Sequence, residues 1–374
     1  MPRILFVSTS TTLGGAEKTL FCLATRLDPK EFAVAGVVSL KPAGFYAQRL
    51  AESGVKTQSL GIRSLPSLKA ARALAAIIRR ERPDVVHSLM YQAIQLCRFL
   101  KRRAGVPFRL VSSPRVSYRS RSTWSLVVDR LLKGADDLLI AESDASRDFL
   151  IRKLGYAESR VRTIYNGVDV ARRPAAGLER QRKRLELGLG PDDVLLVAVG
   201  RLDAQKGHCV LIDAVAELKG FPRLRCAVIG AGPLRGRLED RIRRLNLERS
   251  VRLLGERDDV DSWLSAGEIF VLPSLWEGLP NALLEAMSLG LPVAASAVDG
   301  VCEAVAPNIS GLLVPPQDAG ALARALARLI TDPDLRRRLG EAARTRIAER
   351  FSLPAMIAGY EAAYREALAR RPAK

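Results

Sequence analysis

Residues 194–207 read VLLVAVGRLDAQKG, a continuous apolar run that ends in a short polar loop. Continuous apolar runs are typical of strands in a parallel sheet, because helices cover both faces of such a sheet. Helical patterns, such as those at residues 16–27 and 68–82, alternate with further apolar runs along the chain. These further runs occupy residues 3–9, 32–40, 55–61, 84–89, 108–113, 137–142, 161–169, 224–230, 251–254, 269–273, 292–297 and 312–314. The pattern predicts an α/β protein with two doubly wound, Rossmann-like domains.

The two strand series are separated by a stretch rich in Arg, Pro and Gly. A chain of 374 residues is long for a single core, so two domains are expected. We predict an N-terminal domain over residues 1–168, a linker over 169–193, a C-terminal domain over 194–353 and a separate last helix over 354–374. Open parallel sheets bind ligands at the carboxyl ends of their strands, so we expect the ligand in a cleft between the domains.

Bulk properties exclude several classes of protein. No run of 18 apolar residues occurs, so a membrane-spanning helix is not expected. The N-terminus lacks the pattern of a signal peptide, and the five cysteines form no CxxC pair. We therefore expect a cytoplasmic protein with reduced thiols and no zinc site.

The net charge of +19 is concentrated in the first part of the chain. Residues 1–165 hold 28 Lys and Arg against 13 Asp and Glu, a net +15, whereas residues 166–374 hold 31 against 27, a net +4. This asymmetry indicates an anionic partner for the first domain, either nucleic acid or an anionic membrane surface. The alternative is that abundant arginine simply solvates the helices.

Two loops after predicted strands carry groups that suit a phosphate. Arg201 and Lys206 lie five residues apart, just past the strand at 194–200, so both could bind one phosphate group. The alternative is that they are two ordinary surface cations. The sequence GAGP at 230–233 precedes a predicted helix, where glycine allows a ligand to approach the backbone and the helix N-terminus favours an anion. A plain strand-to-helix turn explains GAGP equally well.

Residues 275–286, LWEGLPNALLEA, place two glutamates around a Gly-Leu-Pro-Asn turn. A helix is expected to start near Pro280, where a missing N–H costs little. Glu285 then lies inside an apolar helix, where a carboxylate is costly to bury unless a partner donates hydrogen bonds to it. Sugar hydroxyls are one such partner, which suggests a ribose for Glu285 and a second sugar for Glu277. A solvated Glu on a half-exposed helix is the alternative.

Together these features resemble the retaining glycosyltransferases of the GT-B fold, in the large family 4 of sugar-nucleotide-dependent transferases. The resemblance covers nearly the whole chain. It rests on the order of GGAE (14–17), YNGVD (165–169), GRLDAQKG (200–207), GAGP (230–233), EGLPNALLE (277–285), PVAASAVDGVCEAV (292–305) and GLLVPP (311–316). It implies two Rossmann-like domains facing across a cleft and a last helix that crosses back to the N-terminal domain.

The resemblance also implies roles for individual residues. Arg201 and Lys206 would hold the donor diphosphate and stabilise the leaving nucleoside diphosphate, Glu285 would bind the ribose and Glu277 the transferred sugar. Family members usually need no metal or other cofactor, and the DVD at 259–261 is expected to cap a helix instead. The implied donor-binding set is Gly14, Gly15, Arg201, Lys206, Gly230, Gly232, Glu277, Gly278, Leu279, Asn281 and Glu285.

The sequence departs from the family at one position. Many relatives carry a histidine after the strand at 108–113, where this chain has Ser113-Pro114-Arg115. His87 ends another strand of the same domain, so we predict it as a catalytic residue beside Arg201, Lys206 and Glu277. A packed strand-end histidine is the alternative. The front-face attack generally pictured for the family requires no dedicated base, since the donor phosphate helps remove the acceptor proton.

The acceptor side is predicted in the basic first domain. Cations interleaved with aromatic rings suit an anionic lipid surface. We therefore expect a peripheral protein on the cytoplasmic membrane face that extends a polyprenyl-phosphate-linked glycan or similar glycolipid, in glycan, lipopolysaccharide or exopolysaccharide assembly. The residues assigned to this side are Arg115, Tyr118, Arg119, Arg121 and Trp124.

Three other functions are compatible with parts of the pattern. A nucleic-acid-binding protein would explain the charge, but the chain lacks a helix-turn-helix or RNP signature. A dinucleotide-dependent oxidoreductase would need the sequence GxGxxG after the first strand. Residues 8–17, where the first strand ends, read STSTTLGGAE instead. A GT-B type sugar-nucleotide epimerase or phosphorylase would share the fold and differ in reaction. The donor base, the acceptor and the oligomeric state are not encoded in these motifs.

Overall fold

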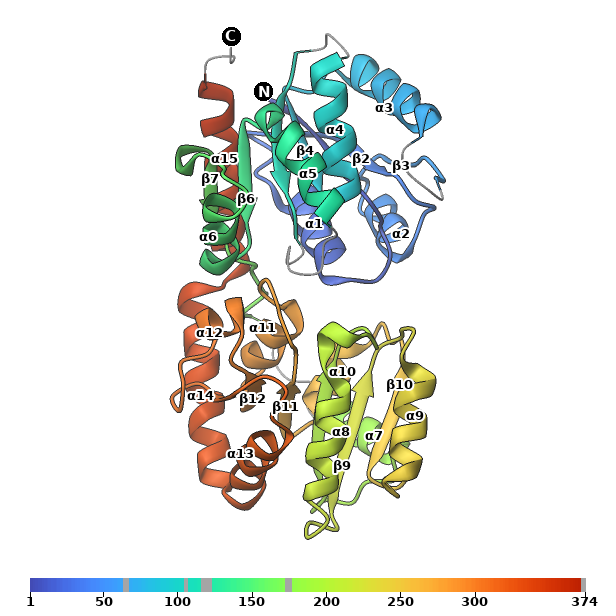
Figure 1. The fold of residues 1–374 in the computed structure, drawn as a ribbon, viewed down its shortest axis with the longest axis vertical. Helices are drawn as coiled ribbons and strands as arrows, with labels where there is room; N and C mark the ends of the chain where they lie inside the picture. The colour runs from blue at the N-terminus through green and yellow to red at the C-terminus, as the bar shows by residue number, and fades with distance from the viewer. Residues whose placement is uncertain (63–66, 104–106, 116–122, 172–176, 371–374) are drawn as a thin grey trace. The chain divides into compact units, whose positions relative to one another are not determined.

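The computed structural model describes residues 1–62, 67–103, 107–115, 123–171 and 177–370. The chain divides into two compact units, each an α/β unit built on one parallel sheet (Figure 1). The first unit comprises Met1–Asn166 with Pro354–Lys374, and the second comprises Gly167–Leu353.

The first unit contains a seven-stranded sheet in the order β3-β2-β1-β4-β5-β6-β7, with every neighbouring pair parallel. Its strands are β1 (Arg3–Ser8), β2 (Ala33–Ser39), β3 (Thr57–Ser59), β4 (Val85–Leu89), β5 (Arg109–Ser113), β6 (Leu138–Ala141) and β7 (Val161–Thr163). Its helices are α1 (Gly15–Arg26), α2 (Phe45–Glu52), α3 (Leu68–Glu81), α4 (Tyr91–Arg103), α5 (Thr123–Leu132), α6 (Asp144–Arg152) and α15 (Leu353–Ala369).

The second unit contains a six-stranded parallel sheet in the order β10-β9-β8-β11-β12-β13. Its strands are β8 (Val194–Val199), β9 (Leu224–Ile229), β10 (Val251–Gly255), β11 (Ile269–Leu272), β12 (Val293–Ser296) and β13 (Leu312–Val314). Its helices are α7 (Leu178–Glu186), α8 (His208–Glu217), α9 (Arg235–Arg244), α10 (Val260–Ala266), α11 (Asn281–Ser288), α12 (Asp299–Ala304), α13 (Ala319–Thr331) and α14 (Pro333–Arg350).

The strands lie where their apolar runs predict, with most ends one or two residues shorter. Leu196, Val228 and Val271 on three neighbouring strands are fully buried and belong to one core with residues of α8 and α13. Fully burying such a side chain contributes about 1.5–3 kcal/mol, and this burial explains why the strands are apolar on both faces. The largest difference is β7, which ends at Thr163 because the YNGVD segment beyond it leaves the sheet.

The stretch predicted as a linker contains a helix that belongs to the second unit. Helix α7 is held by ion pairs: Lys183 Nζ lies 2.6 Å from Asp259 Oδ2, and Arg184 Nη1 lies 2.9 Å from Glu268 Oε2. Its sequence, LERQRKRLE, carries too few apolar residues to show a helical stripe. Contacts of charged side chains with loops around α10 fix this helix instead, and these contacts leave no periodic signal in the sequence.

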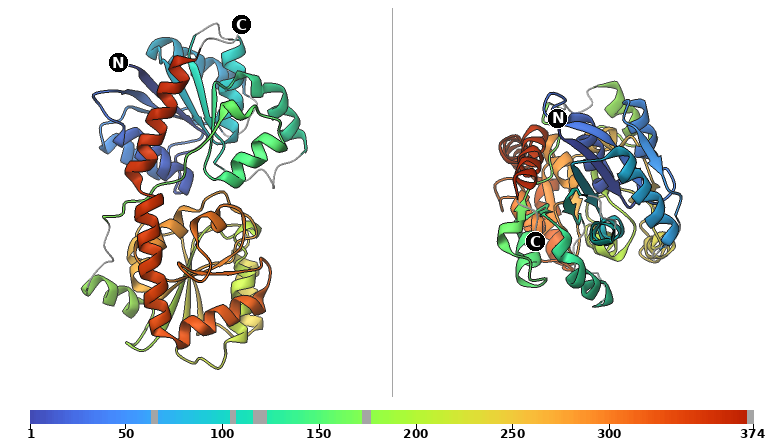
Figure 2. Two further views of the ribbon diagram at one scale, coloured as in Figure 1. Left: turned by 90° about the vertical axis from the view of Figure 1, so that its left-hand side faces the viewer. Right: turned by 90° about the horizontal axis from the view of Figure 1, so that it is seen from above.

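The last helix, α15, packs on the first unit, as the fold prediction has it (Figure 2, left). Arg162 Nη2 lies 2.7 Å from Glu366 Oε1, and the backbone N–H of Asp28 donates to Glu361 Oε1 at 2.8 Å. Tyr360 and Tyr364 of α15 are fully buried. These contacts join the last helix to the first unit. None of the helices formed by the described residues is long and apolar enough to cross a membrane.

Candidate functional site

The carboxyl ends of β8 and β11 are the natural ligand-binding position in the second unit. These strands are neighbours in the sheet, and the strand order reverses between them, which is where open parallel sheets bind their ligands. The loop after β8 carries Arg201 and Lys206, and the loop after β11 carries Glu277. The topology therefore brings three predicted site residues to one edge of the sheet.

Lys206 and Glu277 form a direct ion pair at this edge. Lys206 Nζ lies 2.6 Å from Glu277 Oε1, and the two side chains are 16% and 5% exposed. Ser274 Oγ donates to the same Oε1 at 2.6 Å, and Gln205 Nε2 lies 3.5 Å from Oε2. A carboxylate in this buried position is stabilised by a cation and a hydroxyl, which offset the cost of removing it from water.

The two loops are also joined through their backbones. The N–H of Leu275 donates to the carbonyl of Gln205 at 2.8 Å, and Gln205 Nε2 donates to the carbonyl of Trp276 at 3.0 Å. Gly207 has φ of 62°, and a Cβ there would lie 2.0 Å from the carbonyl oxygen of Pro273. Glycine is therefore required where the first loop crosses the second. This contact fixes the separation of Lys206 and Glu277.

Arg201 is the most open of the predicted phosphate ligands. Its Nη2 lies 3.0 Å from Asp203 Oδ2, and its side chain is 70% exposed. Asp203 also caps the short turn that follows, by accepting from the N–H of Lys206 at 3.3 Å. This loop therefore carries one largely exposed guanidinium and one half-buried ammonium that is fixed by its ion pair with Glu277.

The glycines of GAGP are required by close packing of two loops, and their predicted contact with the donor stays a prediction. Gly230 has φ of 142°, and a Cβ on it would lie 2.0 Å from the carbonyl oxygen of Gly200. A Cβ on Gly232 would lie 2.5 Å from the carbonyl oxygen of Leu202. The loop after β9 thus packs directly on the loop after β8. The lack of a side chain at Gly230 and Gly232 makes this close packing possible.

The remaining predicted donor residues lie on or just before α11. Glu285 is in the second turn of this helix and is 8% exposed, so its carboxylate does not stand in bulk water. Pro280 occupies the position before the first helical residue, Asn281, one residue later than predicted. Gly278 and Leu279 form the turn that carries the chain from Glu277 into the helix.

Two family models match the chain: Glycosyltransferase Family 4 over residues 13–172 and Glycosyl transferases group 1 over residues 179–346. The alpha-D-kanosaminyltransferase of Streptomyces kanamyceticus is 32% identical over 281 residues, which make up 71% of this chain and 72% of that protein. The chain belongs to glycosyltransferase family 4. The motifs from which this membership was inferred lie within the matched ranges.

Other similar proteins give the same result. The UDP-Gal:alpha-D-GlcNAc-diphosphoundecaprenol alpha-1,3-galactosyltransferase of Escherichia coli is 29% identical over 80% of this chain and 79% of that protein. The crystal structure of HepE from Anabaena in complex with UDP-glucose superposes with a TM-score of 0.86 at 24% identity, over 96% of this chain and 99% of that one. The GT-B fold is confirmed, and the epimerase alternative finds no support among these relatives.

His87 of this glycosyltransferase is not the catalytic residue that was predicted. It is fully buried, its Nδ1 lies 2.7 Å from the hydroxyl of Tyr364 on α15, and its Nε2 lies 2.8 Å from Ser113 Oγ. Burial, and to a lesser degree the nearby Arg115, lower the pKa of His87 to about 3. Both ring nitrogens are engaged within the protein, so the histidine anchors α15 on the sheet. Its position at a strand end did not reveal this, because α15 lies far away in the sequence.

The predicted acceptor residues of the glycosyltransferase are only partly described. Arg115 follows β5 with a left-handed φ of 58°, and its Nη1 donates to Asn166 Oδ1 at 2.7 Å. A strained backbone at a strand end is frequent at functional sites. Trp124 is 75% exposed on α5. Tyr118, Arg119 and Arg121 lie outside the described residues.

Gly14 and Gly15 belong to the first unit, at the start of α1. A Cβ on Gly14 would lie 2.5 Å from Glu17 Oε2. Glu17 is itself buried and accepts from Ser10 Oγ at 2.6 Å, so the GGAE motif forms a compact turn after β1. That these glycines reach the donor stays a prediction.

Within the described ranges, no three His, Cys, Asp or Glu side chains lie close enough to hold an ion. Asp259 of the DVD sequence takes the N-cap position of α10, but its side chain makes no capping hydrogen bond and pairs with Lys183 instead. The capping explanation is therefore wrong in its detail.

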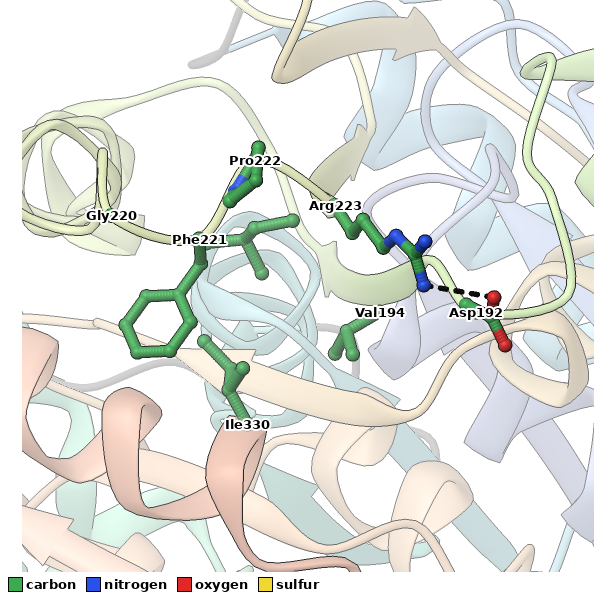
Figure 3. A pocket seen from close by; sticks show the side chains of 8 residues that line it. Asp192, Val194, Gly220, Phe221, Pro222, Arg223 and Ile330 are labelled. Carbon is green, nitrogen blue, oxygen red and sulfur yellow. Dashed lines mark hydrogen bonds and ion pairs between the residues drawn. The ribbon is translucent and has the colours of Figure 1, made fainter.

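A surface depression of about 260 Å³ lies at the opposite edge of the second sheet (Figure 3). Val194 and Leu224, the first residues of β8 and β9, line it, so it is at the amino ends of the strands. Its one ion pair joins Arg223 Nη1 to Asp192 Oδ2 at 2.8 Å, and both side chains are largely exposed. This depression is not the active site, because ligands of such sheets bind at the carboxyl ends.

Sequence reasoning missed Ser274, whose Oγ donates to Glu277, and Gln205, whose Nε2 lies 3.5 Å from the same carboxylate. Ser274 lies two residues after β11 and three before Glu277, a position where a hydroxyl can reach the carboxylate of the same turn. Gln205 adjoins Lys206 and could have been singled out as a neutral donor beside a predicted ligand. Both are polar residues in segments where the chemistry was already assigned to charged neighbours.

Proposed function

We propose that this glycosyltransferase transfers a sugar, with retention of configuration, from a nucleoside-diphosphate sugar to a lipid-linked or saccharide acceptor. The observation that supports this proposal is the fixed cation–carboxylate pair of Lys206 and Glu277 at the carboxyl ends of β8 and β11. A diphosphate needs cations, and a sugar needs carboxylate acceptors for its hydroxyls. Both are present at this end of the sheet, with Glu285 buried on the adjoining helix.

In the proposed reaction, the bond between the anomeric carbon and the phosphate oxygen breaks while the acceptor oxygen bonds to the same face of the sugar. The acceptor proton passes to the departing diphosphate. Arg201 and Lys206 stabilise the negative charge that develops on this leaving group, and such stabilisation lowers the barrier because it is stronger in the transition state. We propose that these two cations act without a metal ion.

A uridine nucleotide is the first donor to test. HepE, which shares the fold, binds UDP-glucose in its crystal structure, and the Escherichia coli relative is named for a UDP-Gal donor. The Escherichia coli enzyme is also named for an acceptor linked to diphosphoundecaprenol. These names support a lipid-linked acceptor for the present enzyme, in the assembly of a glycan, lipopolysaccharide or exopolysaccharide.

Helix α5 supports a peripheral position on an anionic membrane. Its inner face is fixed to α4, because Arg98 Nη1 lies 2.5 Å from the buried Asp129 Oδ1. Its outer face exposes Trp124, Val127 and Leu131 at helical spacing, and residues 1–165 carry a net +15. Aromatic rings prefer the headgroup level, and each basic residue near the surface contributes about 1 kcal/mol. We propose that the enzyme binds the cytoplasmic face of the membrane in this way.

The test is a transfer assay with UDP- and GDP-sugars, with and without a membrane extract, in the presence of EDTA. We expect one sugar nucleotide to be consumed only when extract is present and the product to keep the anomeric configuration of the donor. Consumption without an acceptor would indicate an epimerase or hydrolase. Inverted product, or complete loss of activity in EDTA, would contradict the retaining or the metal-independent part of the proposal.

A further inference from the structure

We infer that Ser274 is a positioning residue that holds the carboxylate of Glu277 so that Oε2 is directed to a hydroxyl of the transferred sugar. The inference rests on the proposed function, because it takes Glu277 as the ligand of that sugar.

The first step is the geometry around Glu277 Oε1. Ser274 is fully buried, and its Oγ lies 2.6 Å from this oxygen, within the range of a charge-assisted O–H···O⁻ bond. A serine hydroxyl has one proton to donate, and here that proton is directed to the carboxylate. Burial removes the freedom of the Ser274 side chain, so the hydrogen bond fixes the carboxylate in orientation as well as in position.

The second step concerns Lys206, which bonds the same oxygen at 2.6 Å. In the proposed function Lys206 binds the donor diphosphate, and a phosphate with more negative charge competes with Glu277 for this ammonium. Glu277 then loses part of its interaction with the cation just as the sugar arrives. Ser274 does not take part in phosphate binding, so it still holds Oε1 at that stage.

The third step concerns the other carboxylate oxygen. Gln205 Nε2 donates one proton to the carbonyl of Trp276 at 3.0 Å, and its contact with Oε2 at 3.5 Å is long compared with the usual 2.9–3.0 Å, so that bond is weak. Oε2 therefore keeps its capacity to accept a hydrogen bond. With Oε1 fixed by Ser274, Oε2 is oriented for one sugar hydroxyl, and this arrangement reduces the cost of ordering the complex.

The experiment measures binding of UDP-glucose and of UDP to Ser274→Ala by calorimetry, with wild type for reference. UDP lacks the sugar, so its dissociation constant should stay within about twofold of wild type. For UDP-glucose the dissociation constant should rise about 10-fold, the loss typical of one hydrogen bond to a charged group. A merely structural role of Ser274 would weaken both ligands alike.

Three further substitutions complete the design. Ser265→Ala is the matched control, because Ser265 is also buried and its Oγ donates to a backbone carbonyl, that of Asp261, at 2.8 Å. In a Glu277→Gln background, Ser274→Ala should cause little additional loss of UDP-glucose affinity, since the carboxylate on which it acts is gone. Ser274→Cys, which keeps a weak donor in a similar volume, replaces the alanine variant if that variant does not fold.

The outcomes separate the inference from the proposed function. If wild type binds neither UDP-glucose nor UDP, and also none of UDP-galactose, GDP-mannose and GDP, the proposed function is contradicted and the inference falls with it. If wild type binds a sugar nucleotide, but Ser274→Ala weakens the sugar nucleotide and the free diphosphate equally or leaves both unchanged, the inference alone is contradicted.

Discussion

Lys206 Nζ lies 2.6 Å from Glu277 Oε1, and this ion pair joins the loop after β8 to the loop after β11. Before a donor binds, the cation proposed for phosphate and the carboxylate proposed for sugar neutralise each other. An arriving diphosphate competes for Lys206. The ion pair thus offsets the desolvation cost of two largely buried charges, and it holds both side chains in position for the ligand.

The first prediction concerns Lys206→Met. The substitution leaves the buried Glu277 without its cation, so the second unit should lose about 1–2 kcal/mol of stability. The affinity for UDP should fall about 10-fold or more, because a charge-assisted bond to the diphosphate is lost. Calorimetry with UDP and thermal unfolding measure the two effects. Lys219→Met, at an exposed position on the same unit, is the control and should change neither UDP affinity nor stability. If K206M binds UDP as tightly as wild type, the assignment of Lys206 to the diphosphate is contradicted.

The second prediction concerns the glycine at which the two loops cross. Gly207→Ala adds a Cβ that would lie 2.0 Å from the carbonyl oxygen of Pro273, at a left-handed φ of 62°. Gly188→Ala, with φ of 69° and no atom within 4 Å of its Cβ, isolates the cost of the backbone conformation alone, about 1 kcal/mol.

G207A should therefore destabilise the second unit by at least about 2 kcal/mol more than G188A, and it should also weaken UDP binding because Lys206 moves. Urea unfolding and UDP titration of both variants test this. Equal losses in the two variants would show that the loops do not cross as described.

The third prediction is a pH dependence of stability. His87 has a pKa of about 3 in the folded protein, lowered by burial, against its ordinary 6.5. Between these values the unfolded chain binds a proton that the folded chain does not, so stability is fully present above pH 6.5 and is lost as the pH falls. His208 behaves alike, since burial lowers its pKa to about 4.

His87→Gln should therefore reduce the slope of the free energy of unfolding against pH by up to about 1.4 kcal/mol per pH unit between pH 6 and 4.5. Urea unfolding of the first unit at several pH values measures it. His208→Gln should flatten the slope for the second unit and leave that of the first unchanged. A wild-type slope in the H87Q first unit would mean that His87 is already charged in the folded protein.

The fourth prediction tests the outer face of α5. Trp124→Ser with Leu131→Ser should lower binding to vesicles that contain phosphatidylglycerol about 10-fold or more, because two exposed apolar side chains no longer enter the headgroup region. The matched control is Leu178→Ser with Leu185→Ser, which removes two equally exposed leucines from α7 in the second unit. Vesicle sedimentation at constant salt measures both. Equal binding of the two double variants would rule out α5 as the membrane-binding face.

The sequence predicts the sheets well because each strand is a continuous apolar run, and it predicts the site where motif and strand end coincide. Arg201, Lys206 and Glu277 follow strands that are neighbours only in space, and the reversal of strand order brings them together. Helix α7 escaped prediction because ion pairs, and not an apolar stripe, fix it.

His87 shows where prediction from the sequence fails. Its sequence position at a strand end is that of a catalytic residue, but Tyr364, 277 residues later, takes up one ring nitrogen. A contact between residues so distant in the sequence leaves no local pattern. Ser274 was missed for a simpler reason, because serine at the end of a strand is common and only the distance to Glu277 shows its role.

The buried carboxylates of the LWEGLPNALLEA segment are proposed to bind an activated sugar. Glu285→Ala tests it most directly, with Glu349→Ala at an exposed position on α14 as control. We predict that E285A folds and melts like wild type but transfers sugar from the true donor at least about 100-fold more slowly, while E349A stays fully active. Near-normal transfer by a folded E285A enzyme would contradict the account.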